Sequence, residues 1–227
     1  MSETTREPQY QFCLDIARDF GVTRLGLMTN QTWRDDPRRL VFTLSRYKFV
    51  SKMLSGLNKV LEVGCADAFG TRIVQQEVGQ LTAVDFDPVF IEDVSQRMDA
   101  RWPFTSFVHD MLEGPVPGGP FDGAYSLDVL EHIQPADERR FLSHICDSLS
   151  EHGVLVLGCP SLQSQQYASP PSKAGHVNCK EAPELKRLAQ DFFHNVFSFS
   201  MNDEVVHTGY HAMAHYLLVV ACGKKKL

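Results

Sequence analysis

Acidic and histidine side chains recur at short spacings in the segment 126–135 of the sequence. Asp128, Glu131 and His132 stand at positions i, i+3 and i+4, which share one face if the segment is helical. Carboxylates and an imidazole on one face can exchange protons with a bound substrate, and they are also ligand types for a divalent cation. His176, in a later polar segment, is a further candidate base because an imidazole titrates near neutral pH.

A glycine turn in the first half of the chain carries a second group of chemistry-bearing residues. The run Val60–Val63 is apolar apart from Glu62, and Gly64 and several small residues interrupt it before a helix-compatible stretch starts near Thr71. A buried strand, a tight turn and a helix start predict a nucleoside-binding βαβ unit. The next apolar strand ends in Asp85, roughly twenty residues after the turn, where a carboxylate can take a ribose diol.

Two carboxylates near this turn decide between kinds of nucleoside. A dinucleotide site needs G-x-G-x-x-G, so that backbone amides can approach a pyrophosphate. Here Glu62 precedes the turn and Asp67 lies within it. Their charges would repel a pyrophosphate, and they suit a ligand that has an ammonium group and no phosphate.

At this turn the chain resembles the class I S-adenosylmethionine-dependent methyltransferases. Their E/D-x-G-x-G-x-G loop corresponds to Glu62-Val63-Gly64-Cys65-Ala66-Asp67-Ala68, with Ala at the second and third Gly positions. One added methyl group restricts close approach only slightly. The resemblance implies S-adenosylmethionine as the cofactor and an α/β, Rossmann-like, seven-stranded sheet that is mostly parallel with an antiparallel last strand.

Ligands of open α/β sheets bind at the carboxyl ends of the parallel strands, and this rule, with the resemblance, assigns the cofactor site. Phe86 would cover the adenine face, and Asp110 would accept the adenine amino group. Arg46, before the first strand, would meet the methionine carboxylate because its fork matches a carboxylate. The cofactor candidates are Arg46, Glu62, Gly64, Ala66, Asp67, Asp85, Phe86, Asp110, Met111, Leu127 and Asp128. Two have structural alternatives, since Asp85 could be a helix N-cap and Asp110 lies in ordinary turn chemistry.

Catalytic and substrate contacts are expected at the same edge of the sheet. The catalytic candidates are His176, His132 and Glu131, and His176 is preferred as general base because a loop after the fifth strand hangs over the methyl group. The alternative for His176 is a polar loop residue or a cap for the next helix. The substrate candidates are Tyr47, Asn202, Glu204 and His207.

The segment D-x-x-E-H also bears on metal binding. It is similar to the E-x-x-E-H of ubiquinone-biosynthesis O-methyltransferases and small-RNA terminal methyltransferases, some of which hold a metal with this segment and a later histidine. Asp128 replaces the first Glu, and its shorter side chain reduces the reach. The sequence therefore favours a site with no metal, and a divalent cation stays possible as the alternative.

Alternating strands and helices must position these residues. Strands are expected at 59–64, 80–86, 104–109, 121–127 and 153–159, and this alternation predicts a parallel sheet with helices on both faces. Two later strands, 195–201 and 215–222, have no helical pattern between them and would form an antiparallel pair.

The chain is expected to divide into a helical cap and a catalytic domain. Residues 1–57 would form an N-terminal cap or lid, and residues 58–227 would form the S-adenosylmethionine-binding catalytic domain as a single compact unit. Within the cap, Phe12, Ile16 and Phe20 share one face of a helix that Gly21 ends, and Pro37 starts another helix.

Composition narrows the functional classes. A chain of 227 residues that is 43% hydrophobic suits one domain with a sizeable core. The net charge of -6 and the lack of a basic stripe argue against a nucleic-acid partner. Six scattered cysteines without a C-x-x-C pair suit reduced thiols in the cytoplasm, and no apolar run suits a signal peptide or membrane partner. The sequence makes no prediction of the oligomeric state.

The expected function is methyl transfer to a small polar metabolite, with oxygen as the expected acceptor atom. Sugars, phosphorylated or phosphonate metabolites and natural-product intermediates are all open as acceptors. A protein or nucleic-acid methyltransferase is one alternative, although amino-nitrogen chemistry needs an N/D-P-P-Y/F motif where Ser126-Leu127-Asp128-Val129 stands. A nucleoside-binding module without catalysis is the other alternative.

Overall fold

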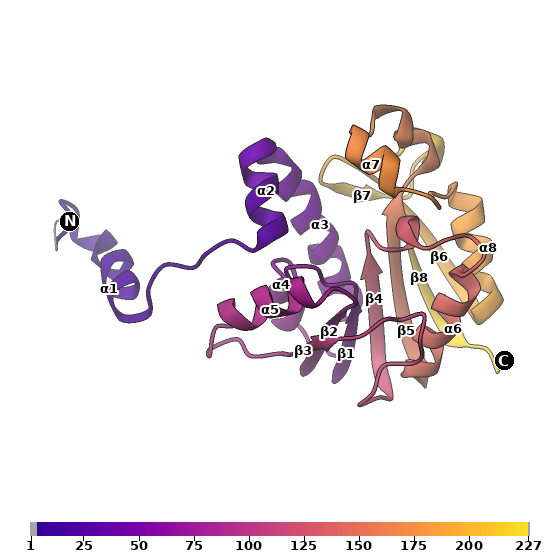
Figure 1. Ribbon diagram of the computed structural model, residues 1–227, viewed down its shortest axis with the longest axis horizontal. Coiled ribbons are helices and arrows are strands. Elements are labelled where there is room, and N and C mark those ends of the chain that lie inside the picture. The colour runs from indigo at the N-terminus through magenta and orange to yellow at the C-terminus, as the bar shows by residue number, and fades with distance from the viewer. Residues whose placement is uncertain (1–3, 227) are drawn as a thin grey trace.

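An eight-stranded sheet runs through the centre of the computed structural model, which describes residues 4–226 (Figure 1). Residues 1–3 and residue 227, at the ends of the expected cap and catalytic domain, lie outside the described part. The strand order is β3-β2-β1-β4-β5-β8-β6-β7. The strands are β1 Lys59–Val63, β2 Gln80–Asp85, β3 Thr105–Val108, β4 Phe121–Leu127, β5 Leu149–Pro160, β6 Phe193–Asn202, β7 Val205–His207 and β8 Tyr216–Lys224.

Pairing within the sheet confirms the mostly parallel arrangement. β1 pairs in parallel with β2 and β4, β2 with β3, and β4 with β5. β8 is antiparallel to both β5 and β6, as the sequence predicts for the last strand. The expected number of seven strands is wrong by one, because β7 forms a hairpin with β6 and is only three residues long, too short to leave a periodic pattern.

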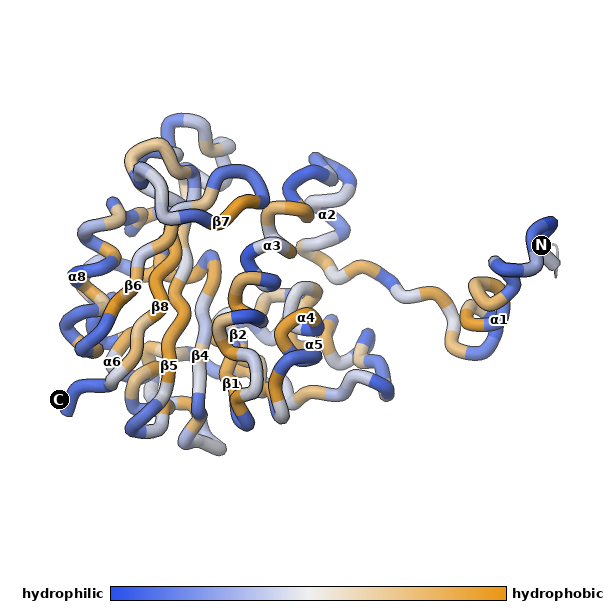
Figure 2. The backbone as a smooth tube through the Cα atoms, turned by 180° about the vertical axis from the view of Figure 1, so that it is seen from behind, coloured by the Kyte–Doolittle hydropathy of each residue, from blue (hydrophilic) through white to orange (hydrophobic). Residues whose placement is uncertain are grey.

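Some of the helices cover the two faces of the sheet, and others lie beyond its edges. They are α1 Gln11–Phe20, α2 Leu27–Asp35, α3 Arg38–Met53, α4 Thr71–Gln75, α5 Pro88–Arg97, α6 Glu138–Ser148, α7 Pro170–Gly175 and α8 Ala182–Phe192, with 3-10 turns η1 Pro8–Tyr10, η2 Leu130–His132, η3 Leu162–Tyr167 and η4 His211–Met213. The apolar sides of α6 and α8 meet one face, and those of α3, α4 and α5 meet the other. Figure 2 shows the hydrophobic strands between these layers. Within residues 4–226, no helix combines the length and apolar character needed to cross a membrane.

The cap over the sheet consists of α2 and α3 only. Figure 1 shows α2 and α7 beyond the carboxyl ends of β4 and β5, whereas α1 stands away from the body at the end of an extended segment. Phe12, Ile16 and Phe20 are 57%, 44% and 66% exposed. The apolar face of this helix is therefore not packed on the sheet, and residues 21–26 form neither helix nor strand before α2 begins.

Candidate functional site

A cavity of about 520 Å³ lies at the carboxyl ends of β1 and β4 and is walled on the other side by α2 and α3. This is the edge where the sequence places the ligand. Of the residues predicted for the site, the cavity wall contains Arg46, Tyr47, Gly64, Ala66, Asp67, Leu127, Asp128, Glu131, His132 and His176. One continuous space therefore joins the turn after β1 to the histidines.

The turn after β1 has the backbone conformation of a glycine loop although two of its residues are alanines. Gly64 has φ 78°, and a Cβ there would lie 2.2 Å from Val129 Cγ2, so only glycine fits. Ala66 and Ala68 have φ 45° and 52°. The left-handed conformation costs about 1–2 kcal/mol for a residue with a Cβ, so the turn keeps its shape at a cost in stability.

Glu62 supports this turn from beneath and does not line the cavity. Its carboxylate is buried and accepts hydrogen bonds from Tyr47 Oη at 2.9 Å, Thr71 Oγ1 at 2.5 Å and Tyr125 Oη at 2.8 Å. Burial raises the pKa of Glu62 to about 7, although the three hydroxyl hydrogen bonds favour the charged form. The carboxylate thus ties α3, α4 and β4 together, where the sequence suggests a direct cofactor contact. Tyr47, a substrate candidate, presents its ring to the cavity while its hydroxyl is engaged by Glu62.

Asp67 attaches the cap to the turn. Its Oδ2 accepts from the Thr29 backbone N–H at 2.7 Å, and its Oδ1 accepts from the Thr29 hydroxyl at 3.2 Å. Thr29 lies in the first turn of α2, where backbone N–H groups have no partner within the helix. The carboxylate predicted to repel phosphate therefore also caps α2 from outside.

Asp85 braces the same turn from β2. Its Oδ2 accepts from Ala66 N at 2.8 Å, and its Oδ1 accepts from Asp87 N at 3.0 Å. The helix-cap alternative for Asp85 is wrong, because the N-cap of α5 is Asp87, whose side chain accepts from Val89 N. Each carboxylate oxygen of Asp85 keeps a further lone pair, so a ribose contact stays a prediction.

Arg46 and Asp128 meet inside the cavity wall. Arg46 Nη1 lies 2.8 Å and 2.6 Å from the two carboxylate oxygens of Asp128, and its guanidinium stacks 3.7 Å from the centre of the Tyr216 ring. Burial opposes the positive charge, yet the Asp128 carboxylate outweighs it and raises the pKa of Arg46. The Arg46 contact with a methionine carboxylate stays a prediction, and its buried Nε has no partner among the described residues.

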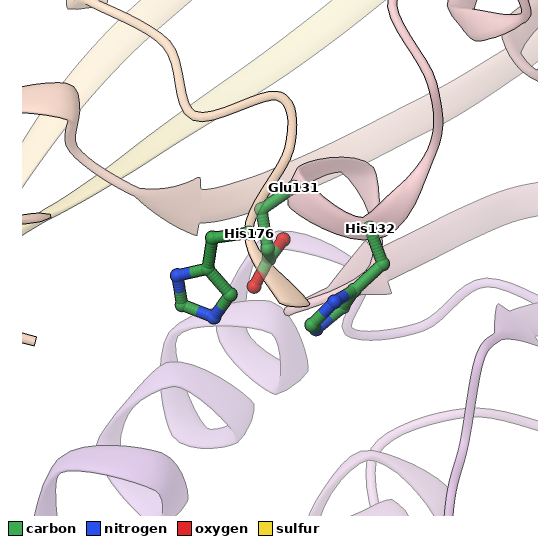
Figure 3. A group of neighbouring side chains, drawn as sticks. All are labelled: Glu131, His132 and His176. Atoms are coloured by element: carbon green, nitrogen blue, oxygen red, sulfur yellow. The ribbon is translucent and has the colours of Figure 1, made fainter. Parts of the chain in front are cut away.

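Glu131, His132 and His176 form a cluster in which one ligand atom from each lies within 4.8 Å of the others (Figure 3). Glu131 and His132 come from η2, and His176 follows α7. The Val177 and Asn178 backbone N–H groups donate to the Glu131 carbonyl at 2.8 Å and 3.0 Å, which fixes the long loop after β5 against η2. The sequence-predicted trio is corrected here, because Asp128, with φ 58°, turns to Arg46 and does not join this cluster.

The electrostatics of the cluster favour the neutral forms of Glu131 and His176. Burial, followed by the Asp128 charge, raises the pKa of Glu131, and its Oε2 has no partner among the described residues. Burial, followed by His132, lowers the pKa of His176. A neutral imidazole can accept a proton, and two imidazoles with an unpartnered carboxylate oxygen also fit the donor preferences of a divalent cation such as zinc.

Besides Glu62 and Asp85, three further cofactor candidates do not line this cavity. Phe86 is 70% exposed beyond the end of β2. Asp110 accepts from Leu112 N at 2.8 Å, as expected of turn chemistry. The Met111 side chain is buried in the core beside α6, so it is not available to an adenine.

The predicted substrate contacts on the last hairpin are also outside the cavity wall. Asn202 and Glu204 lie at the connection between β6 and β7, and His207 ends β7. Asn202 Oδ1 lies 2.8 Å from His207 Nε2, and Asn202 Nδ2 donates to the Met213 carbonyl at 3.0 Å. These contacts brace the β6–β7 hairpin.

Some wall residues were not predicted from the sequence. His215, which directly precedes β8, lines the cavity with Phe42 of α3, and their ring centres are 5.8 Å apart. Burial, followed by Arg46, lowers the pKa of His215. The position of His215 could have been predicted, because an antiparallel last strand starts at the edge of the sheet where the parallel strands end, and His215 directly precedes that strand. Nothing in the sequence marks Phe42 among the apolar residues of its helix.

Comparisons with known proteins agree with this geometry. A family described as "Methyltransferase domain" matches residues 60–153. A probable S-adenosylmethionine-dependent methyltransferase of Mycobacterium tuberculosis is 27% identical over 134 residues, which are 58% of this chain and 47% of that protein. The mitochondrial ubiquinone biosynthesis O-methyltransferase of Schizosaccharomyces pombe is 30% identical over 104 residues, 44% of this chain and 36% of that one. The chain therefore spans about half the length, or less, of these curated relatives.

Solved structures show the same fold. The N-methyltransferase NodS from Bradyrhizobium japonicum, in complex with S-adenosyl-L-homocysteine, has a TM-score of 0.59 at 21% identity and covers 84% of this chain and 91% of its own. The methyltransferase domain of a bacterial Hen1 has a TM-score of 0.66 at 13% identity and covers 80% and 98%. Together with the glycine-type turn, its carboxylates and the reversed last strand, these matches show that the chain has the fold of these methyltransferases and that residues 60–153 are similar to a methyltransferase domain.

Proposed function

We propose that the chain transfers a methyl group from S-adenosylmethionine to an oxygen atom of a small polar metabolite. The observation that carries this proposal is the continuous cavity, which reaches from Gly64 and Ala66 of the cofactor turn to His132 and His176. A cofactor held at the turn would share one cavity with an acceptor beside the imidazoles. Alignment of the acceptor with the sulfonium methyl and exclusion of water are the main requirements of this reaction.

Cavity size and charge support a small acceptor. A volume of about 520 Å³ falls in the range of pockets for small molecules, and the net charge of -6 disfavours a polyanionic partner. All six cysteines, which lie in the described part of the chain, are free thiols, in keeping with a reducing compartment such as the cytoplasm. One relative is named as an O-methyltransferase and one structural neighbour as an N-methyltransferase, so the choice of oxygen rests on the site.

The choice of oxygen rests on a proton acceptor in the cavity wall. An alcohol must lose a proton when it is methylated, and His176 is neutral at neutral pH because its pKa is lowered by burial and by His132. His176 would accept this proton and release it to solvent. Glu131 and His132 would position the acceptor beside it.

The same three residues would hold a divalent cation if one binds. The fit is supported by the buried, unpartnered Glu131 Oε2 and by the closeness of the two imidazoles. Such a cation would lower the pKa of an acceptor hydroxyl. Asp128, the remaining acidic residue of the D-x-x-E-H segment, is engaged by Arg46 on both oxygens and would stay outside this ligand set.

His176→Ala tests the proposed role. We expect kcat to fall by about 10²-fold or more, because a positioned base contributes roughly 10²–10⁴-fold, while S-adenosylhomocysteine affinity stays within about twofold of the wild type. The wild-type pH-rate profile should lose activity as pH falls through the lowered pKa of His176, below its ordinary value of 6.5. A variant that keeps wild-type kcat and the same acidic limb would show that the base lies elsewhere.

A further inference from the structure

Among residues 4–226, Gln165 is the residue whose side chain forms a hydrogen bond with the His176 ring. Gln165 lies in η3, directly after β5, and its Oε1 is 2.8 Å from His176 Nδ1. No sequence motif or spacing predicts a functional role for this glutamine, which is one of three in the segment Leu162–Tyr167. The contact joins two parts of the long loop that walls the cavity.

The other end of the Gln165 side chain fixes which amide atom faces the ring. Its Nε2 lies 3.3 Å from the Ser161 carbonyl oxygen and 3.4 Å from Ser164 Oγ. A carbonyl oxygen only accepts, so the NH₂ group must face Ser161 and Oε1 must face His176. Oε1 in turn only accepts, and the ring hydrogen must therefore be on His176 Nδ1.

Ser161 gives this arrangement a rigid base. Its side chain is fully buried, its hydroxyl donates to the Ala214 carbonyl at 2.6 Å, and its backbone N–H donates to the His215 carbonyl at 3.0 Å. The carbonyl that orients Gln165 is therefore held between the end of β5 and the start of β8. An amide oriented from such a base has little freedom to flip.

His132 is held in the same form by the backbone. Its Nδ1 lies 3.0 Å from the Gly175 carbonyl oxygen, which can only accept, so the hydrogen of this ring is also on Nδ1. Both rings of the cluster thus leave Nε2 with a free lone pair. A hydrogen bond at one ring nitrogen determines what the other nitrogen can do.

We propose that Gln165 is a positioning residue that holds His176 in the Nδ1–H tautomer, so that Nε2 is the atom that acts on the bound acceptor. The proposal rests on the proposed function only in giving His176 a role at the acceptor, since the tautomer is a property of the protein without ligand. A base, or a ligand to a cation, needs that lone pair. The opposite tautomer would present an N–H donor and could do neither.

Long-range ¹H–¹⁵N correlation spectra of histidine-labelled protein test the tautomer directly. The full chain is treated with a chelator and measured above the ordinary pKa of imidazole, at about pH 8, where the rings are neutral. The His176 signals are assigned by their loss in His176→Ala. The variants are Gln165→Leu, which removes the acceptor, and Gln165→Glu, which keeps an oxygen facing the ring. Gln166→Leu is the matched control, because Gln166 is an exposed neighbour in η3 whose side chain donates to the Gln163 carbonyl and not to His176.

We expect the Nδ1–H pattern for His176 in the wild type, in Gln165→Glu and in Gln166→Leu, and a shift toward Nε2–H in Gln165→Leu. In turnover assays, Gln165→Leu should lower kcat about 10-fold or more with unchanged S-adenosylhomocysteine affinity, and Gln165→Glu should restore part of the loss. A wild-type ring with its hydrogen on Nε2, or a Gln165→Leu ring that keeps it on Nδ1, would overturn the proposal. The wild-type spectrum alone can do so, whether or not Gln165→Leu folds. If the tautomers are as expected but His176→Ala is fully active, the positioning stands and the proposed role of His176 fails.

Discussion

The substitution Glu62→Gln should change how the stability of the protein depends on pH. Glu62 is 2% exposed, and its pKa is raised from the ordinary 4.5 to about 7, with burial as the largest cause. The unfolded chain therefore releases this proton at a lower pH than the folded chain does. Stability from this group is fully present at low pH and is lost as pH rises from the unfolded value through the folded one.

The size of the effect follows from the difference between the two pKa values. Each pKa unit corresponds to about 1.36 kcal/mol, so the full difference of 2.5 units amounts to roughly 3.4 kcal/mol. Between about pH 5 and pH 8, the stability that the protein loses through ionisation of Glu62 is roughly 2.5 kcal/mol. Glutamine does not titrate, so the variant should lack this loss. Its Oε1 can accept from the Thr71 and Tyr125 hydroxyls, and its NH₂ group can donate to the Tyr47 hydroxyl oxygen.

Urea unfolding of the wild type and Glu62→Gln at about pH 5 and about pH 8 measures this difference. We expect the wild type to lose roughly 2.5 kcal/mol relative to the variant over that interval. Glu151→Gln, at an exposed position in β5, controls for the removal of one carboxylate charge. A gap between wild type and Glu62→Gln that is the same at both pH values would refute the reasoning that burial raises the pKa of this carboxyl.

Three other changes test separate parts of the site. Asp85→Ala should weaken S-adenosylhomocysteine binding more than tenfold in calorimetric titration, because each hydrogen bond lost from a charged acceptor is worth about 1.5–3 kcal/mol; an unchanged dissociation constant would remove Asp85 from the cofactor site. Activity should survive dialysis against EDTA if His176 acts as the base, whereas a loss that magnesium, manganese or zinc restores would assign Glu131, His132 and His176 to a metal. Ala68→Gly should raise the free energy of unfolding by about 0.5–1 kcal/mol, because glycine removes the cost of φ 52° and adds a smaller entropic one; a lower thermal midpoint would contradict the strain in the turn.

The fold was predictable because its signals are local. Apolar runs that end in Gly64 and Asp85 mark buried parallel strands by themselves, and the missing helix between β6 and β8 predicts their antiparallel pairing. The failures concern elements whose placement depends on tertiary contacts. The apolar stripe of α1 predicts a packed helix, but periodicity does not say what covers the stripe, and here Phe12 and Phe20 remain exposed.

The site was predictable in position and less so in detail. The carboxyl-end rule brings Asp67, Asp128 and His176 to one cavity. The rule does not say which charged groups bind other protein side chains instead of a ligand. Glu62 accepts hydrogen bonds from three hydroxyls, and Asp128 forms an ion pair with Arg46. Such pairings depend on the directions of side chains in the folded protein, which the sequence pattern does not give, and so does the contact of Gln165 with His176.

Methyl transfer from labelled S-adenosylmethionine tests the proposed methylation of a small molecule directly. The wild-type protein is incubated with methyl-labelled cofactor and a metabolite extract, with His176→Ala in parallel, and the products are separated by size. We expect label in the small-molecule fraction as a methyl ether or ester, strongly reduced with His176→Ala. Label in protein or nucleic acid, or cofactor binding with no transfer to any fraction, would contradict the proposal.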